Sequence, residues 1–205
     1  MAAETASTRR APGGSELRDD VTEALAAAFF EELSAVGYGR LSLEAVAKRA
    51  GAGKAAIYRR WPSKRDMTVA LLSRVAIAAI APADTGTLRG DLEHYLHDAV
   101  RALTHPLASR IIPDLMAEAT RDPELAEELM DSLRGPRREN AAKILRAAID
   151  RGEVPADVDL ELSLDFLAGP LYWRLAVVHL PADDDYVDRL VTQLVRFLAL
   201  PGPST

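Results

Sequence analysis

The sequence predicts an all-α protein with an N-terminal three-helix helix-turn-helix head and a C-terminal helical domain. Three observations support this fold class. Alanine and leucine dominate the 205 residues, and β-branched runs with strict alternation are absent. Two short apolar stripes at helical spacing flank a glycine turn at residues 51–53. Positive charge gathers around that turn, although the formal net charge of the chain is −6.

The head is expected at residues 16–62, after a flexible polar arm at 1–15. Its first helix has one apolar face and ends at Gly37 and Gly39, because glycine readily takes the conformation that ends helices. The residues of this face are Val21, Leu25, Ala28, Phe29, Leu33 and Val36.

Two shorter helices complete the expected head. Ser42 is a good N-cap for the second helix, and Glu44 in its first turn suits the helix dipole. The glycine turn then separates it from a third helix, which Pro62 ends. The apolar residues of this pair that face inward against Phe29 are expected to be Leu43, Val46, Ala50, Ile57 and Trp61.

A connecting helix is expected at 63–82, with Ser63 as its cap and Asp66 three residues later, close to a capping box. The remaining residues, 83–205, form the regulatory and dimerisation domain. Gly135-Pro136 is expected to interrupt one of its helices and Pro170 to kink another, because proline removes a helical hydrogen bond. Its helices are expected at 87–104, 107–120, 123–151, 159–179 and 183–200.

Composition excludes several classes of protein. The chain has no cysteine, which removes disulfides, thiolate metal sites and a cysteine nucleophile. No apolar run reaches the roughly 18 residues that a membrane span needs. His94 and His97 share a helix face but lack a third ligand, so no metal is expected. We therefore expect a cytoplasmic protein with no cofactor and no membrane association.

The charge is distributed unevenly along the chain. Between Tyr38 and Arg65 there are eight Lys/Arg and one acid, a net charge of +7. From residue 81 onward there are 13 basic and 22 acidic residues, a net charge of −9. A basic head on an acidic body indicates that the head meets a polyanion.

A helix-turn-helix binds duplex DNA by placing its second helix in the major groove while the first crosses the backbone. With Ile57 and Trp61 inside, the residues Lys54, Tyr58 and Arg59 point outward. Ala55 and Ala56 are small enough for close approach, and an alanine methyl group can contact a thymine methyl group. Lys64 adds its charge to the start of the connecting helix, which suits a phosphate.

The segment "LSLEAVAKRAGAGKAAIYRRWPSKRDMTVALL" resembles the TetR family of bacterial transcriptional regulators, and the resemblance covers about Val21 to Leu72. The alanine-glycine pair, the tyrosine, the large aromatic residue and the lysine all stand at the family's offsets. The resemblance implies a three-helix DNA-binding head, a ligand-binding and dimerising body, and repression that a small molecule releases. It places the DNA contacts on Ser42, Lys54, Ala55, Ala56, Tyr58, Arg59 and Lys64.

The head departs from the family pattern at four positions. Gly53 replaces the usual serine cap, and Ala56 replaces a common threonine. Arg60 stands where histidine is frequent, and Trp61 replaces phenylalanine. These changes leave the fold intact and bear on which operator is read. The segment "AAIDRGEVPADVDLELSLDFLAGPLYWRLAV" also resembles a subset of the family's regulatory domains.

One recognition helix reads too few base pairs to be selective, so a homodimer on palindromic double-stranded DNA is expected, with half-sites about 34–36 Å apart. Two apolar stripes in the last two helices are broad enough to form a four-helix interface with a second copy. Packing inside one chain is the alternative explanation. The stripes are Leu160, Leu164, Leu167, Leu171 and Leu175, and Val187, Leu190, Val191, Leu194, Phe197 and Leu198.

A pocket for a small-molecule effector is expected among the helices of residues 87–178. Methionine and aromatic side chains there indicate an apolar or aromatic effector, although core packing explains them equally well. The candidates are Tyr95, Met116, Met130, Phe166, Tyr172 and Trp173, with His94, His97 or Arg110 as polar groups.

Two other functions remain open at this stage. The chain could be a ligand-sensing or protein-binding helical module without sequence-specific DNA binding. It could also be a small helical enzyme, although no catalytic Ser/His/Asp arrangement is indicated by spacing. A steep dependence of DNA affinity on salt would favour the DNA-binding regulator over the first of these.

Overall fold

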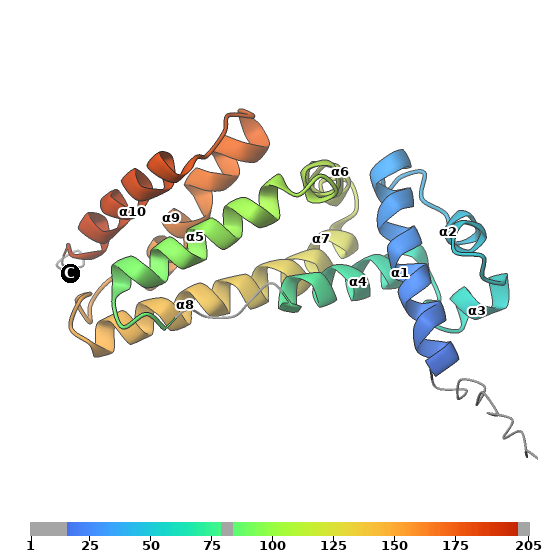
Figure 1. The fold of residues 1–205 in the computed structure, drawn as a ribbon, viewed down its shortest axis with the longest axis horizontal. Helices are drawn as coiled ribbons and strands as arrows, with labels where there is room; N and C mark the ends of the chain where they lie inside the picture. The colour runs from blue at the N-terminus through green and yellow to red at the C-terminus, as the bar shows by residue number, and fades with distance from the viewer. Residues whose placement is uncertain (1–15, 79–83, 201–205) are drawn as a thin grey trace, which may run out of the picture.

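The computed structural model describes residues 16–78 and 84–200, and every regular element within these ranges is a helix (Figure 1). The predicted all-α class is confirmed. The molecule is elongated, with α1, α2 and α3 at one end and α5, α8, α9 and α10 at the other. No helix of the described residues has the length and apolar character needed to cross a membrane.

The head consists of α1 (Glu16–Val36), α2 (Leu43–Arg49) and α3 (Lys54–Tyr58). The expected apolar face of α1 forms the centre of the head, since Leu25 and Phe29 are fully buried. The Ser42 hydroxyl caps α2, because its oxygen accepts a hydrogen bond from the backbone N–H of Ala45 at 3.1 Å.

The turn that ends α1 brings the head against the body. Gly37 has φ +76°, and its N–H donates to the carbonyl of Leu33 at 2.9 Å. A Cβ on Gly37 would lie 2.7 Å from Oδ1 of Asp114 in α6 (Ala108–Ala119). The other oxygen of Asp114 accepts the N–H of Tyr38 at 2.7 Å. Glycine is therefore required here both for the backbone angle and for the close approach of α6.

The connecting helix is α4 (Lys64–Ala78), and it runs from the head toward the body. The expected cap is present, because the backbone N–H of Asp66 donates to the Ser63 hydroxyl at 3.1 Å. The Ser63 hydroxyl in turn donates to the Asp66 carboxylate at 2.7 Å. Met67 and Leu71 are buried and fix the first half of α4 in the core of the head.

The expected proline interruptions take the form of π-helical turns. In η1 the N–H of Gly135 bonds to the carbonyl of Met130, and in η2 the N–H of Val178 bonds to Trp173. Both turns lie close to a proline, which lacks the N–H of a regular α-helix. The helix before α6 is α5 (Leu88–Thr104). The helices after α6 are α7 (Pro123–Leu129), η1 (Met130–Arg134), α8 (Gly135–Asp150), α9 (Leu160–Tyr172), η2 (Trp173–Val177) and α10 (Asp184–Leu198).

The buried apolar residues form two separate cores. The second core lies among α5, α8, α9 and α10. The first core fills the head, but it also contains four fully or nearly fully buried residues from α6 and α7. These four are Ile111, Leu115, Leu125 and Leu129. The first core therefore spans the head and two helices of the body, and the domain boundaries expected at 62 and 83 stay a prediction.

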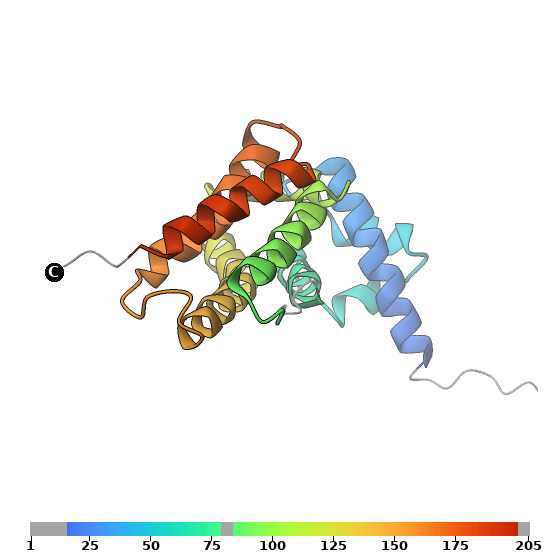
Figure 2. The same cartoon turned by 60° about the vertical axis from the view of Figure 1, so that its left-hand side comes forward.

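The two stripes expected to face a second copy belong largely to the second core. Figure 2 shows α10 lying across α5 and beside α9. Side chains that are already buried within one chain have little surface left to bury against a partner. Packing inside the chain, which was the alternative explanation, therefore accounts for the buried residues of both stripes. The buried residues are Leu164, Leu167, Leu171, Val187, Val191, Leu194 and Leu198, while Leu160, Leu175, Leu190 and Phe197 are half-buried.

Candidate nucleic-acid interface

The turn between α2 and α3 holds the two helices in a fixed arrangement. Gly51 has φ +65°, and the N–H of Ala52 donates to the carbonyl of Ala47 at 2.9 Å. Gly53 caps α3 without a side-chain hydrogen bond, as its lack of a hydroxyl requires. Ile57 is fully buried and Trp61 is 9% exposed, so the inner face of α3 is anchored as expected. This anchoring determines which residues of α3 face outward.

The outer face of α3 carries the residues that the sequence assigned to it. Lys54, Ala55, Tyr58 and Arg59 are all exposed. Ala56 is half-buried instead, and it lines a shallow hollow between α3, the turn and the start of α1. The outward set is therefore a narrow strip that offers one ammonium, one guanidinium, one hydroxyl and one methyl group.

Glu44 occupies part of this strip, which the sequence did not indicate. Its Oε1 lies 2.9 Å from the ammonium of Lys54 and accepts a hydrogen bond from the Tyr58 hydroxyl at 2.8 Å. The hydrogen bonds from Lys54 and Tyr58 lower the pKa of the Glu44 carboxyl to about 2, so the group is ionised at neutral pH. In the DNA-free protein, a carboxylate therefore holds two of the groups expected to contact phosphate.

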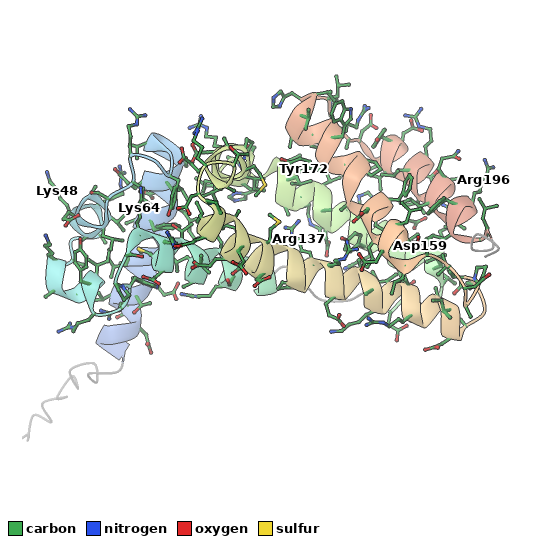
Figure 3. All side chains as sticks on the ribbon, turned by 180° about the vertical axis from the view of Figure 1, so that it is seen from behind. Lys48, Lys64, Arg137, Asp159, Tyr172 and Arg196 are labelled. Carbon is green, nitrogen blue, oxygen red and sulfur yellow. The ribbon has the colours of Figure 1, made fainter. Side chains whose placement is uncertain are left out.

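Lys64 differs from the outward cation that the sequence predicted. It is half-buried, and its ammonium donates to the carbonyls of Tyr38 at 2.8 Å and Gly39 at 3.2 Å. The ammonium also lies 4.5 Å from the centroid of the Tyr38 ring, a cation–π distance. Figure 3 shows Lys64 inside the head, between α4 and the helices in front of it. Two of its three N–H groups thus close the turn after α1, and a phosphate contact through the third stays a prediction.

Other cations of the head also have internal partners. The guanidinium of Arg60 donates to the Thr22 hydroxyl at 2.8 Å and to the carbonyl of Ala56 at 2.9 Å, so it joins α3 to α1. Arg49 pairs with Glu32 of α1 at 2.6 Å. The positive charge available to DNA is therefore smaller than the count of basic residues implies, and it lies mainly on α3 and on the exposed Lys48 (Figure 3).

Arg65 joins α4 to α7 through a group of acids. Its guanidinium pairs with Glu124 and lies 3.5 Å from Asp122 and 3.9 Å from Glu128. The hydrogen bond from Arg65 to Glu124 raises the pKa of the Arg65 guanidinium above its ordinary value. Together with the contact of Asp114 to Tyr38, these pairs connect the head to α6 and α7.

The six candidate pocket residues do not converge on one place. Tyr95 and Met116 are half-buried, whereas Met130 is exposed. Phe166, Tyr172 and Trp173 lie on the outer surface of α9 and η2, with 44%, 36% and 60% exposure, and Figure 3 shows Tyr172 at that surface. The candidate polar groups His94, His97 and Arg110 are exposed or half-buried, and the two histidines lie near Asp98 and Asp184.

Comparison with known proteins agrees with this architecture. Residues 25–71 match the family model described as bacterial regulatory proteins, tetR family. Residues 82–194 match the tetracyclin repressor-like C-terminal domain. Each half of the elongated molecule therefore has its own counterpart in the same kind of regulator.

Individual relatives match nearly the whole chain. The DNA-binding transcriptional repressor TetR of Mycobacteroides abscessus is 33% identical over 180 residues, which cover 87% of this chain and 94% of that protein. The HTH-type transcriptional regulator YdeS of Bacillus subtilis is 30% identical over 175 residues, covering 85% and 88%. The crystal structure of the TetR family transcription regulator SCO0332 has a TM-score of 0.69 and 32% identity, covering 86% of this chain and 97% of that one.

The helical fold and its exposed basic helix-turn-helix define a DNA-binding transcriptional regulator. The chain belongs to the TetR family of these regulators.

We predict that Glu44→Gln increases the affinity of the protein for duplex DNA of any sequence. The substitution removes a negative charge next to the phosphates and releases Lys54 and Tyr58. We expect the affinity for DNA to increase roughly threefold to tenfold at low salt. Fluorescence anisotropy with two unrelated duplexes measures it. The control is Asp150→Asn, which removes the same charge from the far end of α8. An equal gain from both variants would show that net charge, and not the position of Glu44, is responsible.

Proposed function

We propose that this protein is a repressor whose homodimer binds a palindromic duplex operator and leaves it when a small-molecule effector binds. The observation that carries the proposal is an exposed Lys54–Tyr58 strip on a head whose core includes residues of the regulatory domain. The similarity to a protein named as a DNA-binding transcriptional repressor supports repression rather than activation.

In the proposed complex, α3 lies in the major groove. The exposed Ala55 methyl group meets the base edges, while Lys54, Tyr58 and Arg59 contact phosphates or bases. Ser42 uses its oxygen lone pair to cap α2, which leaves its O–H free to donate to a phosphate. Binding requires the phosphates to compete with Glu44 for Lys54 and Tyr58.

The effector acts through α6 and α7 in this proposal. Ile111, Leu115, Leu125 and Leu129 pack in the core of the head, so a displacement of their helices changes the direction in which the head points. An effector that binds better to a head arrangement unsuited to the operator shifts the population away from DNA, by no more than its differential affinity.

The dimer interface is proposed on the outer face of α9 and η2. Leu162, Phe166 and Trp173 are 46%, 44% and 60% exposed, although all three are large apolar residues. A cluster of this kind on a soluble regulator marks a protein-binding surface, and a second copy of the chain placed about a twofold axis would cover it. This face replaces the buried stripes as the surface that a partner helix pair would contact.

We predict that Lys54→Ala weakens DNA binding and reduces its salt dependence. Each protomer loses one phosphate contact, so the slope of log affinity against log salt decreases by about two for a dimer, with a similar loss on all sequences. Electrophoretic mobility shift assays between 50 and 300 mM salt, roughly the range where such slopes are resolved, provide the measurement. The control is Lys143→Ala, an exposed lysine on α8.

The same series decides between the two remaining functions. If the unmodified protein shows a shallow salt slope and no preference among duplexes, it is a ligand-sensing or protein-binding module rather than an operator-binding repressor. If Lys54→Ala and Lys143→Ala have equal slopes, the assignment of Lys54 to phosphate is wrong.

We predict that Trp173→Glu converts the dimer to monomers and thereby reduces operator affinity by at least about tenfold, since a charge in a desolvated interface costs several kcal/mol. Sedimentation equilibrium measures the assembly state, and circular dichroism checks the fold. Val75→Glu is the control, because Val75 is also exposed (53%) but lies on α4. A dimer that survives Trp173→Glu unchanged would place the interface elsewhere.

A further inference from the structure

One buried polar atom in the described part of the chain has no hydrogen-bond partner. Asn140, on α8, is 7% exposed, and its side-chain oxygen Oδ1 is the single buried side-chain polar atom of the described residues that is left unsatisfied. Burying such an oxygen without a donor destabilises the folded protein, and native structures seldom retain one without a reason. The oxygen therefore calls for a donor that the described residues do not supply.

Arg137 lies three residues before Asn140, so the two side chains share one face of α8. Arg137 is half-buried and forms no ion pair with any residue that the structure describes. Its neighbour Arg138 behaves differently, because it pairs with Glu161 and with Asp165, the latter at 2.8 Å. A half-buried guanidinium without a carboxylate partner, in a domain rich in acids, is suited to an anion from outside the chain.

Tyr95 places a third polar group near the same position from the opposite helix. Burial between α5 and α8 raises the pKa of its hydroxyl, and the positive charge of Arg137 acts in the opposite direction. Tyr95 packs against the second core, and α5 packs against α8, so the phenol and the guanidinium lie on neighbouring helices. Figure 3 shows Arg137 in the middle of the molecule, on the side of α8 that faces α5. The Tyr95 hydroxyl has no hydrogen bond with a described residue.

We propose that Arg137, Asn140 and Tyr95 form the polar end of the effector site and that the effector is an organic acid. Its carboxylate pairs with the guanidinium of Arg137, and a neighbouring hydroxyl or N–H group donates to Oδ1 of Asn140. The Tyr95 hydroxyl donates a further hydrogen bond to the carboxylate. This inference rests on the proposed function, and it narrows the apolar or aromatic effector expected from the sequence to one with an acidic group.

The position of these residues connects the site to the head. The start of α8 and the preceding η1 both pack against α4, and α4 carries Lys64 and Arg65 at its other end. A carboxylate that draws Arg137 toward α5 therefore acts on the helices that determine where α4 lies. The buried neighbours of Asn140 on α8 include Ala141 and Ile144, which are apolar, so the rest of the ligand is expected to be hydrocarbon or aromatic.

The first test needs no ligand. Replacing Asn140 with leucine removes the unsatisfied oxygen while keeping the branched shape and the number of side-chain heavy atoms, so Asn140→Leu is expected to raise the Tm of the ligand-free protein by about 2–4 °C. The control is Ser163→Ala, since Ser163 is equally buried but donates to the carbonyl of Asp159 at 2.6 Å and should lose stability. A lower Tm for Asn140→Leu would show that Asn140 supports the fold, and it would overturn the proposal.

The second test measures the preference for an acid. Benzoate, 3-hydroxybenzoate and hexanoate are each compared with their methyl esters by thermal shift and calorimetric titration. At least one acid is expected to bind at least tenfold tighter than its ester, and Arg137→Gln is expected to abolish the difference, whereas Arg138→Gln keeps it. The proposal is overturned if no acid is preferred over its ester, or if the preference survives Arg137→Gln.

Operator binding of the same variants separates this inference from the proposed function. Arg138→Gln should bind DNA as the unmodified protein does, because Arg138 lies outside both the head and the proposed acid site. Normal DNA binding without any acid preference would refute the effector class alone. Absence of sequence-specific DNA binding by the unmodified protein would refute the repressor itself.

Discussion

The packing of α6 and α7 into the hydrophobic core of the head is the interaction on which the rest of the structure depends. Leu115 and Leu125 are buried beside residues of α1 and α4, and the backbone N–H of Tyr38, in the short loop after α1, donates to the carboxylate of Asp114. Gly37 permits this approach because any side chain there would collide with Asp114. The DNA-binding head and helices α6 and α7 of the regulatory domain thus share one core, which gives a ligand in the body a mechanical route to the DNA-binding surface.

Internal ion pairs and hydrogen bonds reduce the positive charge on the DNA-binding surface that the shared core holds in place. Much of the positive charge of the head is used internally: Lys64 closes the turn after α1, Arg60 joins α3 to α1, and Arg65 joins α4 to α7. The strip that remains on α3 is opposed by the ionised carboxylate of Glu44. A strip of modest charge limits indiscriminate attraction to DNA, so selectivity depends more on the shape of the interface.

Periodicity in the sequence predicted the parts of this structure that local chemistry controls. The inward positions of Ile57 and Trp61 and the outward position of Tyr58 follow from helical spacing, and the Ser42 cap follows from the residue itself. The stripe that contains Leu167 was expected to face a second copy, yet Leu167 is buried within one chain, because spacing says only that a face is covered and not whether the cover comes from the same chain. Contacts between distant residues, such as Tyr38 with Asp114 or Arg65 with Glu124, leave no local pattern and needed the three-dimensional structure.

The most direct test of the shared core is hydrogen–deuterium exchange on Leu115→Ala, read separately for the amides of α1, α2 and α3. Leu145→Ala provides the comparison, since it deletes the same atoms from a fully buried leucine in the second core. Each substitution costs about 2–5 kcal/mol of stability. Leu115→Ala should accelerate exchange throughout α1–α3 and weaken operator binding, while Leu145→Ala leaves these amides protected. Equal protection of α1–α3 in both variants would contradict a core shared between head and body.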